Sequence, residues 1–237
     1  MALRPNSPRP QRSLRQNTSL QTAIGTLFLV FSVCIILTFS GIGGLFSPFS
    51  TQTILSPGDI AFVQYNADDT DNFAFVALTD VSPGTVIYFT DNEENSLSGG
   101  EGTLTWEAPA GGLACGTVVT IDKNENASHG SITDERNNFE LAGGGDGILA
   151  FQGSSNTAAT TYLAAISNDG GAWGSNKVGA LPAGLSNGTH ALAVNPEVDN
   201  VAYHGSTLVG DQNTLLAEIN DPNNWTNGSN SDQRSFV

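Results

Sequence analysis

Acidic side chains gather at two places where strands are expected to begin or end, and their chemistry suits a metal ion. Asp68, Asp69 and Asp71 lie in a turn between the first two expected strands, and Asp91 and Glu93 follow the third. Carboxylate oxygens on loops are the ligands that Ca²⁺ prefers. If the first three strands form a meander, both acidic groups lie at the same rim of the domain, because strand direction alternates. The sequence therefore indicates a calcium site at this rim.

Turn chemistry alone is the alternative explanation of these acids. Neither group matches the calcium loop of an EF-hand or the nonapeptide calcium repeat. Asp and Asn are also favoured in turns, because their side chains form hydrogen bonds with the nearby backbone. Both interpretations stay open at this stage.

A second pattern has the spacing of a hydrolase nucleophile. Residues 184–188 read G-L-S-N-G, and Asp199 and His204 follow in the order of a catalytic triad. Such a serine needs a strand before it and a helix after it, so that a strained turn exposes its hydroxyl. Here Pro182 precedes the motif and a strand-like run, 190–194, follows it. We interpret the motif as a turn and predict that the protein is not an enzyme.

The three tryptophans are expected to have two different roles. Trp106 ends an apolar strand and Trp225 follows the last predicted helix, so both are predicted to close the ends of the hydrophobic core. Trp173 lies in the glycine-rich segment 169–174, which offers little to bury it. We therefore predict that Trp173 is an exposed contact for a protein or glycan partner.

The domain that carries these residues follows a leader of opposite charge. Residues 1–22 contain four arginines and no acid, and they form a basic region before the uncharged apolar segment 23–46. This segment has the length of either a signal peptide or a transmembrane anchor, and both alternatives stay open. The arginines keep the N-terminus on the cytoplasmic side. Either way the domain lies outside the cytoplasm, secreted or anchored at the cell surface.

Charge and cysteine content limit what the exported part can be. The formal charge of the whole chain is −15, and four of its eight basic residues lie in the leader, which leaves −19 for the rest. Such a field argues against nucleic acid as a partner and leaves the leader as the contact with the membrane. Cys115 is the single cysteine after the leader. The domain therefore depends on its hydrophobic core and not on an internal disulfide.

Residues 58–225 are predicted to form an all-β domain, an antiparallel β-sandwich with one short helix near its C-terminal end. Short apolar and β-branched runs alternate with Gly, Asn, Asp and Pro, as strands alternate with turns. In the third run Val86, Tyr88 and Thr90 share one face, and Ile87 and Phe89 share the other. The expected strands are 60–65, 73–79, 85–90, 103–106, 117–121, 139–142, 148–152, 162–166 and 190–194.

Three further segments have assignments of their own. The helix is expected over 213–219, with Asp211 as its N-cap and Pro222 beyond its end. Residues 47–57 are uncharged and rich in Ser, Thr and Pro, which is typical of a tether. Residues 226–237 are mostly polar, and we expect a flexible tail there.

Several segments of the domain carry a resemblance to a known type of module. They are 58–62 (GDIAF), 73–78 (FAFVAL), 84–92 (GTVIYFTDN), 100–106 (GEGTLTW), 181–185 (LPAGL), 199–203 (DNVAY) and 220–225 (NDPNNW). Together they resemble a β-sandwich module of secreted and surface proteins of bacteria. The opening strands are also similar to lamin-tail-like domains, which are immunoglobulin-type sandwiches. The resemblance implies an accessory surface module without catalytic residues.

These observations lead to three expected functions. The first is a non-catalytic surface, adhesion or binding module outside the cytoplasm, with Ca²⁺ at the acidic rim as an expected stabilising ion and an unknown protein or glycan as its partner. The second is a structural subunit of an extracellular matrix or filament, in which strand edges pair between copies of the chain. The third is an accessory module of a secreted hydrolase system.

Overall fold

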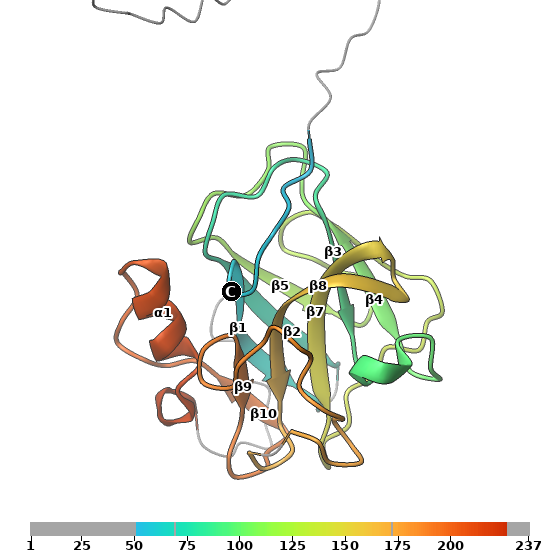
Figure 1. The fold of residues 1–237 in the computed structure, drawn as a ribbon, viewed down its shortest axis with the longest axis vertical. Helices are drawn as coiled ribbons and strands as arrows, with labels where there is room; N and C mark the ends of the chain where they lie inside the picture. The colour runs from blue at the N-terminus through green and yellow to red at the C-terminus, as the bar shows by residue number, and fades with distance from the viewer. Residues whose placement is uncertain (1–50, 69, 172, 227–237) are drawn as a thin grey trace, which may run out of the picture. The chain divides into compact units, whose positions relative to one another are not determined.

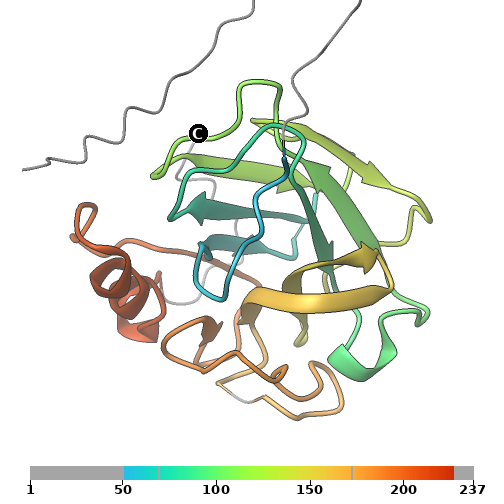
Figure 2. The same ribbon diagram turned by 45° about the horizontal axis from the view of Figure 1, so that its top comes forward.

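The computed structural model describes residues 51–226, except residues 69 and 172. They belong to one compact unit, Phe46–Val237. Two sheets pack around a common core, as Figures 1 and 2 show from two directions. Among the described residues no helix has the length and apolar character needed to cross a membrane. The apolar segment 23–46, expected to be a signal peptide or an anchor, lies outside the described residues.

The four-stranded sheet has the order β10–β1–β2–β5, and the six-stranded sheet has the order β6–β4–β3–β7–β8–β9. All neighbouring strands are antiparallel except β8 and β9, which run parallel. The expected sandwich is thus confirmed as two sheets, with one parallel pair. The strands are β1 (Ile60–Asn66), β2 (Asn72–Ala77), β3 (Val86–Thr90), β4 (Thr103–Glu107), β5 (Val118–Asp122), β6 (Ser131–Asp134), β7 (Gly147–Ser155), β8 (Ala158–Ser167), β9 (Ala191–Ala193) and β10 (Asn200–Ala202).

Eight of the nine expected strands are present, and one is wrong. Residues 139–142 form no strand, although their composition is apolar. The expected meander of the first three strands is also wrong, because β3 pairs with β4 and β7 in the other sheet. Two short strands, β6 and β10, were not predicted. Each has only three or four residues, which is too short for a recognisable alternation.

The helix prediction is confirmed. The helix α1 spans Gln212–Ile219, and the carboxylate of Asp211 accepts a hydrogen bond from the backbone N–H of Thr214 at 3.0 Å. Leu216 and Ile219 are buried against the core. Two single 3₁₀ turns complete the described helical structure, η1 (Glu94–Ser96) and η2 (Pro222–Asn224).

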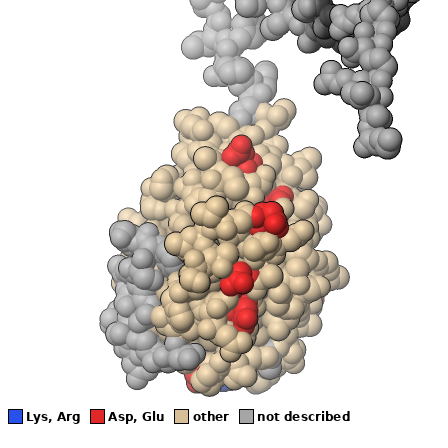
Figure 3. All heavy atoms as spheres, turned by 90° about the vertical axis from the view of Figure 1, so that its left-hand side faces the viewer, with Lys and Arg blue, Asp and Glu red and all other residues tan. Residues whose placement is uncertain are grey.

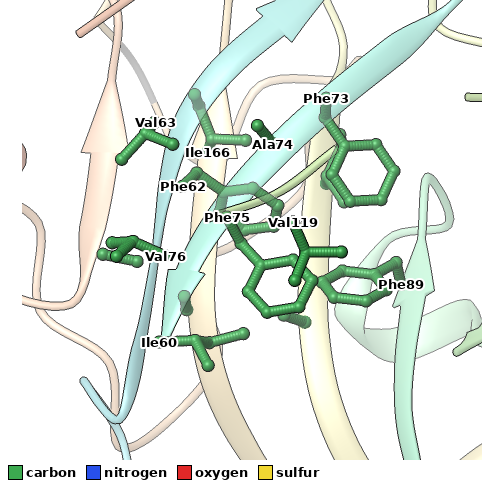
Figure 4. Close-up of a cluster of buried hydrophobic side chains, with 14 of the residues drawn as sticks. Ile60, Phe62, Val63, Phe73, Ala74, Phe75, Val76, Phe89, Val119 and Ile166 are labelled. Carbon is green, nitrogen blue, oxygen red and sulfur yellow. The ribbon is translucent and has the colours of Figure 1, made fainter. Parts of the chain in front are cut away.

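Aromatic rings fill the centre of the core (Figure 4). The ring of Phe89 on β3 lies between rings of the opposite sheet, with centroids 4.9 Å from Phe73 and 5.3 Å from Phe75. Phe62 on β1 contacts the same ring edge-on, at 6.1 Å. The sequence predicted that Phe89 shares a face of β3 with Ile87, and the structure shows that this face points into the core. The two sheets are therefore joined mainly by interlocking phenylalanine side chains.

Trp106 and Trp225 occupy the core, which confirms the prediction for both. Each side chain is almost fully buried. The indole N–H of Trp106 donates to the carbonyl of His129 at 2.8 Å, and that of Trp225 donates to the carbonyl of Ile219 at 2.6 Å. Both polar atoms are satisfied, so each tryptophan adds a large apolar area to the core without an unpaired donor.

The described part of the expected tether, residues 51–57, lies against the domain. The backbone N–H of Leu55 donates to the side-chain oxygen of Gln152 on β7 at 2.8 Å, and Leu55 itself is buried. The backbone N–H of Thr53 donates to the hydroxyl of Thr85 at 2.9 Å. Of the expected tail, only Thr226 is described, and it pairs with Ala202 through two hydrogen bonds.

A second, smaller apolar cluster lies outside the core. Leu149 on β7, Ala165 on β8 and Ala191 on β9 point away from the core and are covered by Leu185. Leu185 belongs to the long connection between β8 and β9, residues 168–190. This connection therefore covers one part of the outer face of the six-stranded sheet.

Replacing Phe89 with alanine should destabilise the domain strongly, because it opens a cavity between the sheets. The expected loss in the free energy of unfolding is about 3–5 kcal/mol, measured by urea denaturation. Leu208→Ala is the control, because Leu208 is 73% exposed, and its cost should stay within about 0.5 kcal/mol. Equal losses in the two variants would contradict this account of the core.

Candidate functional site

Four buried aspartates converge on one segment at one end of the domain. The backbone N–H groups of four consecutive residues, 139 to 142, each donate to a different carboxylate. Phe139 donates to Asp134 at 3.0 Å, and Glu140, Leu141 and Ala142 donate at 2.9 Å to Asp91, Asp71 and Asp146 respectively. We call this arrangement the aspartate clamp. It explains why residues 139–142 form no strand, since their donors are already taken.

Secondary structure places each carboxylate of the clamp. Asp71 directly precedes β2, Asp91 directly follows β3, Asp134 ends β6 and Asp146 directly precedes β7. The predicted convergence of Asp71 and Asp91 is therefore seen, although β2 and β3 lie in different sheets. Asp134 and Asp146 were not predicted as members. The only signal for Asp146 is its place in the glycine-rich turn 143–147.

The clamp carboxylates have further partners, which contact the second oxygen of Asp91 and of Asp146 and, in Asp71, the same oxygen that accepts from Leu141. Asp91 accepts from the backbone N–H of Gly102 at 2.6 Å, and Asp146 accepts from that of Gly147 at 2.7 Å. Asp71 forms an ion pair with Lys123, whose ammonium nitrogen lies 3.0 Å from the carboxylate. These side chains connect both sheets to the 139–142 segment through charge-assisted hydrogen bonds.

Burial dominates the electrostatics of the clamp. It raises the pKa of Asp91 to about 8 and that of Asp146 to about 7, against the lowering effect of the backbone N–H donors. The negative charge of Asp146 contributes to the raised pKa of Asp91. Burial also raises the pKa of Asp71, and the hydrogen bonds from Leu141 and Lys123 oppose it. Ionised carboxylates are therefore held here at a free-energy cost near neutral pH.

The structure does not assemble the predicted calcium ligands into one group. Asp68 accepts a hydrogen bond from the side-chain amide of Asn200 at 2.7 Å, and Asp71 is paired with Lys123. Asp69 lies outside the described residues, and Glu93 is only half-buried. Within the part of the chain that the structure describes, no three His, Cys, Asp or Glu side chains are placed to hold a metal ion.

An opening of about 600 Å³ lies beside two members of the clamp. Asp91 and Asp146 contribute to its wall, together with Glu101, Asn138 and Glu140. No lysine or arginine lines it. Burial, and the charge of Glu93, raise the pKa of Glu101. This opening is the most acidic concave surface among the described residues, and the sequence predicted only Asp91 as part of it.

Trp173, the predicted exposed contact, is half-buried. Its ring packs against the small cluster of Leu149, Ala165, Leu185 and Ala191 on the outer face of the six-stranded sheet. Its indole N–H donates to the side-chain oxygen of Asn187 at 3.1 Å. Trp173 thus helps to fasten the 168–190 connection to the sheet, a role that its glycine-rich surroundings did not suggest.

The residues of the hydrolase-like pattern are not placed as a triad. The backbone carbonyl of Ser186 accepts from the N–H groups of Thr189, His190 and Ala191, so Ser186 lies in a turn, as predicted. The imidazole of His204 contacts the backbone carbonyl of Trp225 at 2.9 Å. In the described residues, Ser186, Asp199 and His204 share no side-chain hydrogen bond.

A groove without charged residues lies on the part of the six-stranded sheet that the 168–190 connection leaves open. It has a volume of about 460 Å³ and is bordered by the segment 52–54, by Val86 and Tyr88 on β3, and by the β7–β8 hairpin. Tyr88 points outward because its neighbours Ile87 and Phe89 point into the core. We call this feature the neutral groove.

The side-chain amide of Gln152 and a row of three aromatic rings hold the neutral groove in shape. The side-chain amide of Gln152 donates to the carbonyls of Thr53 at 3.0 Å and Val86 at 3.1 Å, which ties the border segment to the sheet. The Tyr88 ring lies 5.2 Å from Phe151, and Phe151 lies 5.9 Å from Tyr162. Alternation predicted that Tyr88 lies on the face opposite to Ile87 and Phe89, but nothing in the sequence indicated that segment 52–54 lies beside it.

Comparison of the chain with protein-family models, with curated proteins and with solved structures finds no match. The site arguments therefore rest on the geometry of this chain alone. The resemblance to lamin-tail-like modules receives support only at the level of a two-sheet, sandwich-like β-fold.

The clamp predicts that stability falls as the pH rises. The pKa values of Asp91 and Asp146 are raised above the unfolded value of about 3.9, so the folded protein holds their protons more tightly. Their stabilising effect is complete below that value and is lost as the pH passes about 7 and about 8. Between about pH 5 and pH 9 the free energy of unfolding should fall by roughly 2–5 kcal/mol in urea denaturation.

Two asparagine variants separate this effect from general charge effects. Asp91→Asn should reduce the fall, because it removes one titrating group and a negative charge close to Asp146. Asp211→Asn should leave the fall unchanged, because Asp211 is exposed and its pKa is lowered by the hydrogen bond from Thr214, so it titrates below this range. A wild-type stability that stays constant or increases from pH 5 to pH 9 would refute the prediction.

Proposed function

We propose that this protein is a non-catalytic binding module that works outside the cytoplasm, held at the cell surface or secreted. The leader supports the location, because its arginines and apolar segment are typical of an export signal or anchor. One observation carries the binding function. The neutral groove is concave and uncharged on a strongly acidic chain, and the 168–190 connection, which covers another part of the sheet, leaves it open.

The charge pattern of the surface agrees with a selective binding site. On the face that carries α1, acidic side chains appear as separate spots on a largely uncharged surface (Figure 3). The net charge is −15 for the chain, so nucleic acids and other polyanions are repelled. A binding partner must therefore be neutral or cationic.

The alternative role as a matrix or filament subunit receives less support from the sheet edges. At the outer edge of β5, the backbone N–H of Asp122 donates to the carbonyl of Asn126 at 3.0 Å. At the outer edge of β10, Thr226 pairs with Ala202. Both edges of the four-stranded sheet are thus partly occupied within the chain. Strand pairing between copies needs open edges, so this assembly is the weaker proposal.

The proposed location predicts that the domain of the full chain is accessible from outside the cytoplasmic membrane. With a C-terminal tag and expression in a bacterium, protease added to intact spheroplasts should remove the tagged domain. A chain that starts at residue 46 lacks the leader and is the control, and it should stay protected until the cells are lysed. Protection of the full chain in intact spheroplasts would overturn the proposed function.

Stabilisation by Ca²⁺ is the second part of the proposal, and it is assigned to the opening beside Asp91 and Asp146. Ca²⁺ takes 6–8 oxygen ligands and accepts water among them, so Asp91, Asp146 and the amide oxygen of Asn138 offer a starting set that water would complete, since no three acidic side chains of the described residues are placed to hold the ion together. The ion would also offset the cost of burying these charges. Asp71 is excluded from the set, because Lys123 occupies it.

Thermal unfolding in EDTA and in Ca²⁺ tests this assignment. A site with a Kd near 10 μM should add about 2.7 kcal/mol to the free energy of unfolding at 1 mM Ca²⁺. Asp146→Asn should abolish the increase, whereas Asp122→Asn, at a half-buried residue outside the opening, should preserve it. If the wild-type protein melts at the same temperature in EDTA and in Ca²⁺, the calcium site is refuted. The carboxylates then act only as hydrogen-bond acceptors in the clamp.

A further inference from the structure

The neutral groove combines three properties that together define a class of ligand, and this inference rests on the binding function proposed above. The first property is the absence of charge: no lining residue is Asp, Glu, Lys or Arg, although the chain has 23 acids. An ionic ligand would find no counter-charge there. The groove therefore suits a neutral molecule.

The second property is a set of hydroxyl groups without partners. The side-chain hydroxyls of Tyr88, Ser154 and Thr161 line the groove, and none makes a hydrogen bond to a described residue. Each hydroxyl can donate one hydrogen bond and accept others. A purely apolar ligand would cover these groups and leave them unsatisfied, which is costly. The ligand must therefore carry several hydrogen-bonding groups of its own.

The third property is an aromatic ring at the wall of the groove. The ring of Tyr88 is half-buried and backed by Phe151, so its direction is fixed. The side chain of Ile54 in the border segment is 90% exposed and adds apolar surface at the rim. A flat ring next to hydroxyl groups matches a molecule that has one apolar face and a polar edge.

We propose that the neutral groove binds a neutral saccharide, with the apolar face of one sugar ring against Tyr88 and its hydroxyls bonded to Ser154 and Thr161. A volume of about 460 Å³ accommodates one or two sugar rings. The side chain of Gln152 holds the border segment in place before binding, through Leu55, Thr53 and Val86. A groove formed in advance loses little conformational entropy on binding.

The acidic surface outside the groove decides against two competing ligands. Anionic molecules, including acidic polysaccharides, are repelled by a chain of charge −15. A cationic peptide would bind the acidic opening beside Asp91 and Asp146 in preference to a groove without carboxylates. Anionic and cationic ligands are thus both disfavoured in the groove, and a neutral, hydroxyl-rich ligand is the class that remains.

The test measures binding of four neutral disaccharides, maltose, cellobiose, lactose and N,N′-diacetylchitobiose, by calorimetric titration of the domain 46–237, which is one compact unit. At least one should bind. Its affinity should fall about tenfold in Tyr88→Leu, which removes the ring, and by less than about threefold in Tyr88→Phe, which keeps it. Raising NaCl from about 50 mM to about 500 mM should change the Kd by less than about twofold, because no charge takes part.

Two matched variants guard against general effects of substitution. Thr161→Val removes a hydroxyl from the groove and should weaken binding about fivefold. Thr133→Val changes the same residue type on β6, outside the groove, and should leave the Kd unchanged. A melting curve for each variant confirms that it is folded.

Three results would overturn the saccharide assignment: binding of none of the four disaccharides, an affinity that Tyr88→Leu leaves intact, or an affinity that falls steeply with salt. None of these results affects the proposed location, because protease access in spheroplasts tests it separately. A domain that is exported but binds no disaccharide would therefore refute the ligand and leave the export proposal standing.

Discussion

The aspartate clamp is the interaction that holds the two sheets together at the end of the domain where residues 139–142 lie. Residues 139–142 present four consecutive N–H groups, and those of the buried Phe139 and Leu141 would be costly to leave without partners. Carboxylates from four separate places in the chain accept them, and these places lie in both sheets. A domain with no disulfide within its described residues thereby joins its sheets through polar bonds as well as through the aromatic core.

The clamp also shows why acidic residues are tolerated inside this domain. An isolated buried carboxylate would lose its charge or destabilise the fold, because desolvation disfavours the ionised form. Here each carboxylate receives at least two donors, and in Asp71 one of the two is the ammonium group of Lys123. Gly102 belongs to the same arrangement, since a Cβ at this position would overlap the backbone of Phe139. Close approach of the two backbones is what brings Phe139 and Glu140 within reach of the carboxylates.

Residue alternation predicted the elements of the fold but not how they are assembled. Period-two patterns located eight strands and the inward and outward faces of β3, and capping chemistry located α1. The partners of each strand depend on contacts between residues that are distant in the sequence. The alternation pattern therefore could not predict that β3 pairs with β7. The segment 139–142 shows the limit most clearly. Its composition is that of a strand, and only the four distant carboxylates make it a loop.

The same limit explains how much of the candidate sites was visible in the sequence. Asp71 and Asp91 were recognised as acids that meet at one end, but their backbone donors could not be, since these come from 139–142 and 102. Alternation placed Tyr88 on the face of β3 opposite to Ile87 and Phe89, but a groove requires a second wall. That wall is residues 52–54, whose polar composition is typical of a tether and whose position is set by the amide of Gln152. A single half-buried glutamine thus converts a flat sheet face into a concave surface. Local sequence patterns can therefore predict the strand residues at the floor of the groove but not the second wall.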